Sequence, residues 1–215
     1  MATKQTDAKR GKRTQQAHDY LLGLGHLTVK FAEVHRAPRY PDGHRENDAE
    51  HSFHLSLSAV ELAADFYPEL DVGLVAQFST VHDLPEVYAG DVRTFKITDE
   101  QRQQKKLAEA AAMKRLVKEL PPYTVQLLKR YEKQVEPEAR FVRFVDKLLP
   151  AIINISSGDA NSFRSDYNMM SLEELNQMRA MHLQQLEAMF PDFPAVHLLC
   201  QLLWKTAADS EFDQK

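Results

Sequence analysis

The sequence predicts an all-α fold in a single domain. Only seven of the 215 residues are glycine, and the alternation of β-branched and polar residues that marks strands is scarce. Apolar residues instead recur at three- and four-residue steps through most of the chain, which is the period of an amphipathic helix. A length of 215 residues also suits one compact domain, because two very small domains would each bury too little surface.

The N-terminal part of the chain divides into a basic arm and a first helix. Residues 1–13 lack apolar periodicity, so they are expected to form a flexible arm, with its positive charge on Lys4, Lys9, Arg10, Lys12 and Arg13. A helix is expected over 14–36, because Leu24, Leu27 and Phe31 recur on one side. Pro38 and Pro41 then break the helix, which leaves 37–45 as a loop.

Two further helices are expected to bring histidines to their ends. Asn47, with Glu50 three residues later, is the pattern of a helix N-cap with a reciprocating glutamate, so the second helix is expected over 48–66. The third helix is expected over 72–82, because Pro85 prevents its regular continuation. The His82-Asp83 pair is therefore expected at a helix C-terminus.

Helices continue to the end of the predicted domain, which covers 14–210. They are expected over 98–119, 123–133, 138–155 with a kink at Pro150, 171–190 and 194–204. Asp146 lies among the apolar residues of the 138–155 helix. An acid placed among core residues needs a partner, so Asp146 is a candidate for a functional site.

Composition excludes several classes of protein without selecting a function. The hydrophobic fraction of 43%, the charged fraction of 27% and the net charge of −4 are near globular averages, so no bulk attraction to nucleic acid is expected. Cys200 is the only cysteine, which excludes an intramolecular disulfide and favours a reducing compartment. No stretch approaches the ~20 apolar residues that span a bilayer, and no signal peptide is apparent, so a cytoplasmic protein is expected.

Metal-binding side chains occur at three of these helices. His51 lies at the start of the second, His82-Asp83 at the end of the third, and Asp146 within the 138–155 helix. Two imidazoles and two carboxylates suit one divalent ion, either Mn²⁺, Co²⁺, Fe²⁺, Ni²⁺ or Zn²⁺. Such a ligand set leaves coordination positions for water and a phosphate oxygen, which indicates metal-assisted hydrolysis.

The order of these residues resembles the H…HD…D pattern of the HD-domain phosphohydrolases. The motifs Arg36-Ala-Pro, Glu46-Asn47, Glu50-His51-Ser52 and His82-Asp83-x-x-Glu86-Val-x-x-Gly90-Asp91 are similar, within that superfamily, to the bacterial 5′-deoxynucleotidase family. The resemblance covers about half of the chain, from Arg36 to Asp146. It implies an HD-type helical bundle that acts on a nucleotide and assembles as a homodimer.

The resemblance also implies a role for each matching residue. It implies that one ion is bound by His51, His82, Asp83 and Asp146. Glu86 and Asp91 match the family's catalytic acids, and Arg36 matches its phosphate-binding arginine, whose planar guanidinium suits a phosphate. Without the resemblance, Arg36 is also consistent with a helix-end charge, Glu86 with a first-turn acid and Asp91 with a turn residue.

The expected reaction is release of phosphate from (deoxy)nucleoside monophosphates. One departure concerns substrate choice, because Ala37 stands where the family carries a tryptophan near the sugar. Arg39, His44 and Arg45 also offer positive charge for a longer phosphate chain, so a (d)NTP phosphohydrolase is an alternative. A non-catalytic nucleotide sensor is a third interpretation. Separately, the apolar run over 196–204 suits either the core of the domain or a contact in a dimer.

Overall fold

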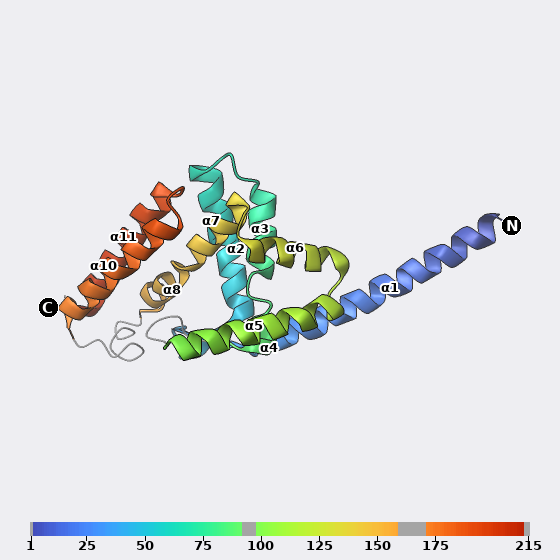
Figure 1. Ribbon diagram of the computed structural model, residues 1–215, viewed down its shortest axis with the longest axis horizontal. Helices are drawn as coiled ribbons and strands as arrows, with labels where there is room; N and C mark the ends of the chain where they lie inside the picture. Colours follow the sequence, from blue (N-terminus) through green and yellow to red (C-terminus); the bar gives the residue numbers. More distant parts are fainter. Residues whose placement is uncertain (1, 92–97, 159–170, 213–215) are drawn as a thin grey trace.

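The computed structural model describes residues 2–91, 98–158 and 171–212, and these fold as helices around one core with a single small β-ribbon (Figure 1). The elements, in chain order, are α1 (Ala2–Phe31), β1 (His35–Arg39), β2 (Arg45–Asn47), α2 (Asp48–Phe66), α3 (Val72–Val81), α4 (Glu86–Ala89), α5 (Asp99–Glu119), α6 (Pro122–Lys133), α7 (Pro137–Asp146), α8 (Leu149–Ser157), α10 (Leu172–Met189) and α11 (Pro194–Phe212). The predicted all-α, single-domain class is confirmed.

The core lies where α2, α3 and α7 pack against one another. Its largest fully buried side chains include Phe78 of α3 and Phe141 and Phe144 of α7. The last two helices, α10 and α11, lie side by side at one end of the molecule, and α11 packs on α8 (Figure 1). The Phe144 ring stacks on Phe190 with 4.9 Å between centroids, which joins this helical pair to the core.

Three helices begin at capping boxes, and the first of them is the Asn47–Glu50 pair that the sequence predicts. Asn47 accepts hydrogen bonds from the backbone of Ala49 and Glu50, while Glu50 accepts one from the Asn47 backbone. Thr98 with Gln101 and Ser171 with Glu174 form the same reciprocal pairs. The first of these caps fixes the start of α2, and therefore the position of His51 in its first turns.

The first helix and the loop after it differ from the prediction. Helix α1 begins at Ala2 and ends at Phe31, so residues 2–13 are helical and Arg36 lies in a strand instead of a helix end. The extended backbone before Pro38 is favoured because a proline disfavours the α conformation of the residue preceding it. Strand β1 pairs antiparallel with β2, with His35 opposite Asn47 and Arg39 opposite Arg45.

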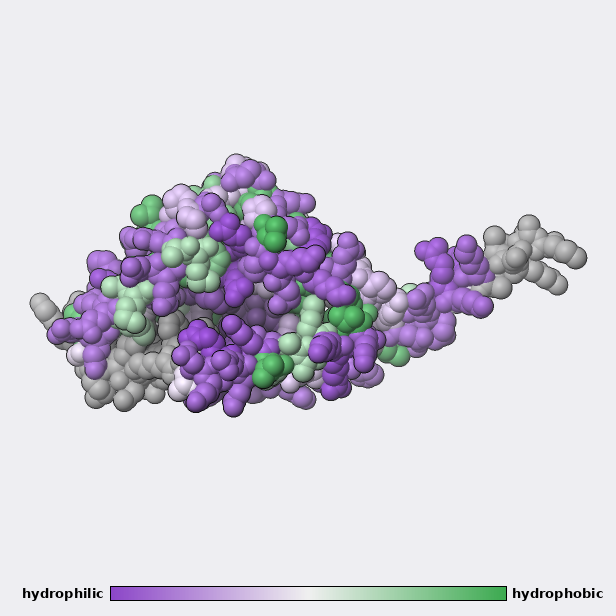
Figure 2. Space-filling model, viewed as in Figure 1, coloured by the Kyte–Doolittle hydropathy of each residue, from purple (hydrophilic) through white to green (hydrophobic). Residues whose placement is uncertain are grey.

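The N-terminal half of α1 projects from the body of the molecule (Figure 1). Its side chains from Lys9 to Asp19 are exposed, and Figure 2 shows hydrophilic side chains along this projection. The flexibility of the basic arm and the boundary at residue 14 remain predictions. No helix in the described ranges is both long enough and apolar enough to cross a membrane.

The helix predicted over 138–155 is two helices, α7 and α8. The backbone N–H groups of Lys147 and Leu148 donate to the carbonyls of Phe144 and Val145, three residues earlier, and these tight turns end α7 at Asp146. Pro150 falls in the first turn of α8, where its missing N–H costs no helical hydrogen bond. The break places the Asp146 carboxylate at a helix end, beside the first turns of α2.

Candidate metal centre

The structure brings together the four residues predicted to bind a metal. His51 lies one turn into α2, His82 is the C-cap of α3, Asp83 follows it, and Asp146 is the last residue of α7. Each offers a ligand atom within 4.8 Å of those of the others. Residues separated by up to 95 positions therefore meet at one point because three helix ends converge on it.

The individual distances show how closely the nitrogen and oxygen donors approach. His51 Nε2 lies 3.0 Å from Asp146 Oδ1 and 3.9 Å from Asp83 Oδ2. His82 Nε2 lies 2.9 Å from Asp83 Oδ2 and 4.0 Å from Asp146 Oδ1. Both imidazoles thus direct the same ring nitrogen toward the same pair of carboxylates.

The hydrogen bonding of His82 fits a metal ligand. Its Nδ1 donates to the carbonyl oxygen of Ser79 at 2.8 Å, which leaves the lone pair of the neutral ring on Nε2. Among the described residues, none makes a well-directed hydrogen bond to this buried Nε2, although Asp83 Oδ2 lies 2.9 Å away. A mixed set of imidazole nitrogens and carboxylate oxygens is the donor chemistry of first-row divalent ions, so these four side chains fit such an ion.

The electrostatics of the site favour the charged form of the two carboxylates among the candidate ligands, Asp83 and Asp146. Burial opposes the ionisation of Asp146, but the charge of Lys147 and the hydrogen bond with His51 hold its pKa well below the usual range. Burial likewise opposes ionisation of Asp83, yet His82 and Arg36 lower its pKa. Burial alone would lower the pKa of His51, and the adjacent carboxylates of Asp146 and Glu46 raise it to about 9.

Arg36 lies at the centre of this acidic cluster. Its Nη1 donates to Asp83 Oδ2 at 2.7 Å, and its Nη2 lies 3.8 Å from Asp146 Oδ1. Burial disfavours the guanidinium charge, but the surrounding carboxylates, Asp83 first, raise the pKa of Arg36 further above its usual range. Arg36 belongs to strand β1, and its side chain extends from the ribbon to Asp83. The predicted phosphate-binding arginine therefore borders the metal centre.

The two predicted catalytic acids lie beside the ligands, outside the four-residue set. Glu86 opens α4, and its Oε2 is 4.0 Å from Arg36 Nη1. Burial and the neighbouring charges of Asp83 and Asp91 raise the pKa of Glu86 to about 10. Asp91 follows Gly90, whose φ of 75° turns the chain, and burial raises the pKa of Asp91 against the opposing charge of Arg36.

Helix α4 is held in place by a cluster around Tyr88. The guanidinium carbon of Arg115 lies 3.8 Å from the centroid of the Tyr88 ring, and the hydroxyl of Tyr88 donates to Glu119. Arg115 in turn donates to Glu119 at 2.8 Å. This cluster joins α4 to α5, and it fixes the short helix that carries Glu86.

Sequence reasoning missed three charged residues of the site. Glu46 is buried, with Oε2 3.5 Å from His51 Nδ1 and 3.6 Å from Arg36 Nε. Asp48 is also buried, 3.4 Å from Arg36 Nη1, and burial with the charge of Asp83 raises its pKa to about 7. Asp48 precedes His51 by three residues, so helical spacing places both on one face. Lys147 contacts Asp146, which its position next to a ligand could have indicated.

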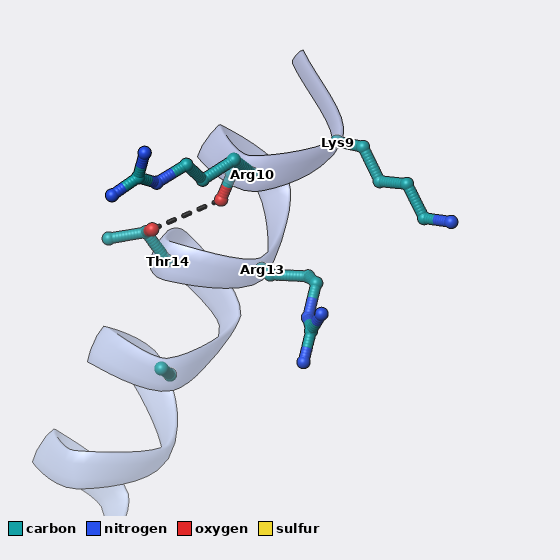
Figure 3. A pocket seen from close by; sticks show the side chains of 5 residues that line it. Lys9, Arg10, Arg13 and Thr14 are labelled. Atoms are coloured by element: carbon teal, nitrogen blue, oxygen red, sulfur yellow. Dashed lines mark hydrogen bonds between the residues drawn. The ribbon is translucent and has the colours of Figure 1, made fainter. Parts of the chain in front are cut away.

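A hollow on the surface of α1 is separate from the metal centre. It is lined by Lys9, Arg10, Arg13, Thr14 and Ala17, all from one helix. Figure 3 shows the basic side chains extending away from one another, and its one hydrogen bond runs from Thr14 to the Arg10 carbonyl at 3.0 Å. Nothing in this arrangement converges on a ligand, so the metal centre is the candidate functional site.

The chain is similar to proteins of known structure. The chain is similar to a predicted metal-dependent phosphohydrolase from Magnetospirillum magnetotacticum MS-1, with 25% identity and a TM-score of 0.68 over 89% of this chain and 94% of that one. A conserved hypothetical protein from Pyrococcus furiosus, at 20% identity, shares the fold with a TM-score of 0.53 over 86% of this chain and 98% of its own. No curated protein matches.

The family is shown by a match over most of the chain. Residues 30–187 match the model of the HD domain family, and this range contains the four candidate ligands together with Arg36, Glu86 and Asp91. The matching model describes the HD domain in general, and it does not assign the chain to the 5′-deoxynucleotidase family, which the motifs resemble. The chain belongs to the HD domain family.

Proposed function

We propose that this protein is a divalent-metal-dependent phosphohydrolase that releases phosphate from (deoxy)nucleoside monophosphates. The observation that carries the proposal is the convergence of His51, His82, Asp83 and Asp146 within 4.8 Å of one another beside the Arg36 guanidinium. The name of the bacterial structural relative, a predicted metal-dependent phosphohydrolase, supports the reaction class. The motif similarity between Arg36 and Asp146 supports a nucleotide substrate.

The division of labour follows from the positions of the side chains. When bound by the four ligands, the ion supplies Lewis-acid chemistry, activating water and withdrawing charge from a phosphate oxygen. Arg36 binds the phosphate through its guanidinium and stabilises negative charge that develops on the oxygens. Glu86 transfers a proton to or from the reacting oxygens, because it borders Arg36 without belonging to the ligand set. Asp91, which follows Gly90 at the end of α4, contributes a second acidic group beside Arg36.

Contacts within the β-ribbon favour a monophosphate over a triphosphate. Arg39 donates to the carbonyl of Gly43 at 3.2 Å, so its guanidinium is engaged at the tip of the ribbon. His44 lies between Asp42 and Glu50, 2.5 Å and 3.2 Å from their carboxylates. These two cationic groups are therefore held within the ribbon and at the start of α2, which weakens the case for a (d)NTP phosphohydrolase.

Turnover by the reconstituted protein tests the function. Metal-stripped protein is loaded with Mn²⁺, Co²⁺, Fe²⁺, Ni²⁺ or Zn²⁺ and given nucleoside mono-, di- and triphosphates, with separate detection of phosphate, pyrophosphate and triphosphate. We expect phosphate from monophosphates only. His82→Gln should abolish this activity, whereas His18→Gln, which changes an exposed histidine on α1, should retain it. Release of triphosphate from a nucleoside triphosphate would establish the alternative, and binding without turnover would establish the sensor.

We propose a homodimer in which α11 contributes to the contact. In the apolar run of this helix, Val196 and Trp204 are buried, whereas Leu198 and Leu202 are 62% and 61% exposed one turn apart. The run thus faces both the core and the outside, which supports a partner on its outer face. Light scattering at micromolar concentration should give the dimer mass, and Leu202→Glu should give the monomer mass. A monomeric wild-type protein would contradict the proposal.

A further inference from the structure

Lys147 borders the metal centre without belonging to its ligands. It is the C-cap of α7, directly after Asp146, and its backbone N–H donates to the carbonyl of Phe144 at 3.0 Å. This tight turn directs the side chain back to Asp146, where Nζ lies 2.5 Å from Oδ2. The Oδ1 atom of the same carboxylate is the one that approaches His51, so Lys147 and this imidazole contact different oxygens of Asp146.

Lys147 and Arg36 contact the two oxygens of one carboxylate. Arg36 Nη2 lies 3.8 Å from Oδ1 of Asp146, and Lys147 Nζ lies 2.5 Å from Oδ2. Their accessibility differs, because the Arg36 side chain is 12% exposed and that of Lys147 is 32% exposed. Arg36 is therefore the inner cation of the site, and Lys147 is the outer one, within reach of a molecule that enters from solvent.

The negative charge of the metal centre makes both cations, Arg36 and Lys147, important for binding an anion. Carboxylates outnumber them even when the neutral Glu86 is left out, since the site and its border contain Glu46, Asp48, Asp83, Asp91 and Asp146. Among the described residues, Arg36 and Lys147 are the lysine or arginine side chains within 4.0 Å of a metal-ligand carboxylate. An anionic substrate is repelled by this surplus of negative charge, so its binding depends on the fixed cations as well as on the ion.

We propose that Lys147 is a second phosphate-binding residue, which together with Arg36 fits the site to the dianion of a phosphomonoester. This inference rests on the proposed phosphohydrolase function. A lysine ammonium on its flexible four-carbon stem is a strong point charge for phosphate, and it complements the planar guanidinium of Arg36. A phosphomonoester carries its second negative charge above a pKa of about 6, whereas a phosphodiester has only one, so a pair of cations discriminates between them.

Phosphate binding to the metal-loaded protein tests the role of Lys147. Inorganic phosphate is titrated calorimetrically at pH 7.5 into the Mn²⁺-loaded wild type and into Lys147→Met, Lys147→Gln and Lys147→Arg. Loss of one charge-assisted contact should weaken phosphate binding by about tenfold or more in the two neutral variants. Lys147→Arg should stay within about threefold of the wild type, because it keeps the charge. Dimethyl phosphate, a monoanion, should lose less affinity than inorganic phosphate in the neutral variants.

Two further measurements separate substrate binding from support of the metal ligand. Lys205→Met removes a surface lysine that lies 2.6 Å from Asp209, a matched ion pair away from the centre, and should bind phosphate as the wild type does. Titration of Mn²⁺ alone into the metal-free neutral variants should give a dissociation constant near that of the wild type. Equal loss of Mn²⁺ and phosphate affinity would show that Lys147 only positions Asp146, and this would overturn the proposal.

Other outcomes also decide the matter. Unchanged phosphate affinity in both neutral variants, or no phosphate binding by the Mn²⁺-loaded wild type, would overturn the role of Lys147. A wild-type protein that binds phosphate through Lys147 but hydrolyses no nucleotide would refute the proposed function alone. Nucleotide turnover with phosphate binding insensitive to Lys147 would refute this inference alone.

Discussion

Protonation of His182 should destabilise the fold in mildly acidic solution. This histidine lies in α10, 9% exposed, with its ring 5.8 Å from that of Trp204 in α11. Burial, reinforced by the charge of Lys147, lowers its pKa from 6.5 to about 4. The folded protein therefore binds fewer protons than the unfolded chain between these values. The stability that the neutral ring contributes is complete above about pH 6.5 and is lost progressively as the pH falls toward about 4.

The size of the effect follows from the same pKa values. A difference of 6.5 − 4 = 2.5 units corresponds to a limit of about 3 kcal/mol at low pH, at about 1.4 kcal/mol per unit. At pH 5, where the unfolded histidine is almost fully protonated and the folded one is not, the loss is about 2 kcal/mol. For a chain of this length, that loss lowers the melting temperature by about 4–8 °C.

Thermal unfolding at pH 7 and pH 5 measures this contribution. Wild type and His182→Leu are compared with chelator present, so that groups common to both proteins, including the metal ligands, cancel in the difference. The fall in melting temperature from pH 7 to pH 5 should be about 4–8 °C smaller in His182→Leu. His18→Leu, a change at an exposed histidine of α1, is the control and should follow the wild type. An identical fall in wild type and His182→Leu would refute the reasoning.

Three further predictions concern the metal centre and the core. Metal at about 100 times its dissociation constant should stabilise the wild type by about 2.7 kcal/mol, which raises the melting temperature by about 5–11 °C. Asp146→Ala should show no such rise, and a normal rise would exclude Asp146 as a ligand. Glu86→Gln should lower kcat by about 10²- to 10⁴-fold with Mn²⁺ affinity retained, and a drop below tenfold would transfer its role to Asp91. Phe144→Ala removes a fully buried ring stacked on Phe190 and should cost about 3–5 kcal/mol in urea unfolding, and a loss below about 1 kcal/mol would contradict its place in the core.

Local signals in the sequence predicted much of the fold. Helix α2 begins at Asp48 because Asn47 and Glu50 close a capping box, an interaction contained within four residues. The meeting of the four candidate ligands was predictable for a related reason. His51, His82 and Asp83 lie beside helix ends that caps and prolines mark, and the order of the residues matches a pattern that is rare by chance.

Features that depend on distant contacts were not predictable in this way. The ribbon that carries Arg36 exists because His35–Arg39 pairs with Arg45–Asn47, and two such short strands have no periodic signature of their own. Asp48 resembles an ordinary first-turn acid until the fold buries it beside Arg36. The break after Asp146 replaces a kink expected at Pro150, because the turn bonds of Lys147 and Leu148 end α7 before the proline is reached.

Arg36 lies in the β-ribbon, whereas the four candidate ligands lie at helix ends. This separation affects how the protein can evolve. The turn at Tyr40 to His44 closes through the hydrogen bond between the Tyr40 N–H and the His44 carbonyl, at 2.9 Å, and none of the four candidate ligands lies in it. Mutations and insertions can accumulate at this tip without disturbing the helices that hold His51, His82 and Asp146. Ala37 lies in the same ribbon, so under the proposed function, lineages that keep the four candidate ligands are free to diverge in the substrate that they accept.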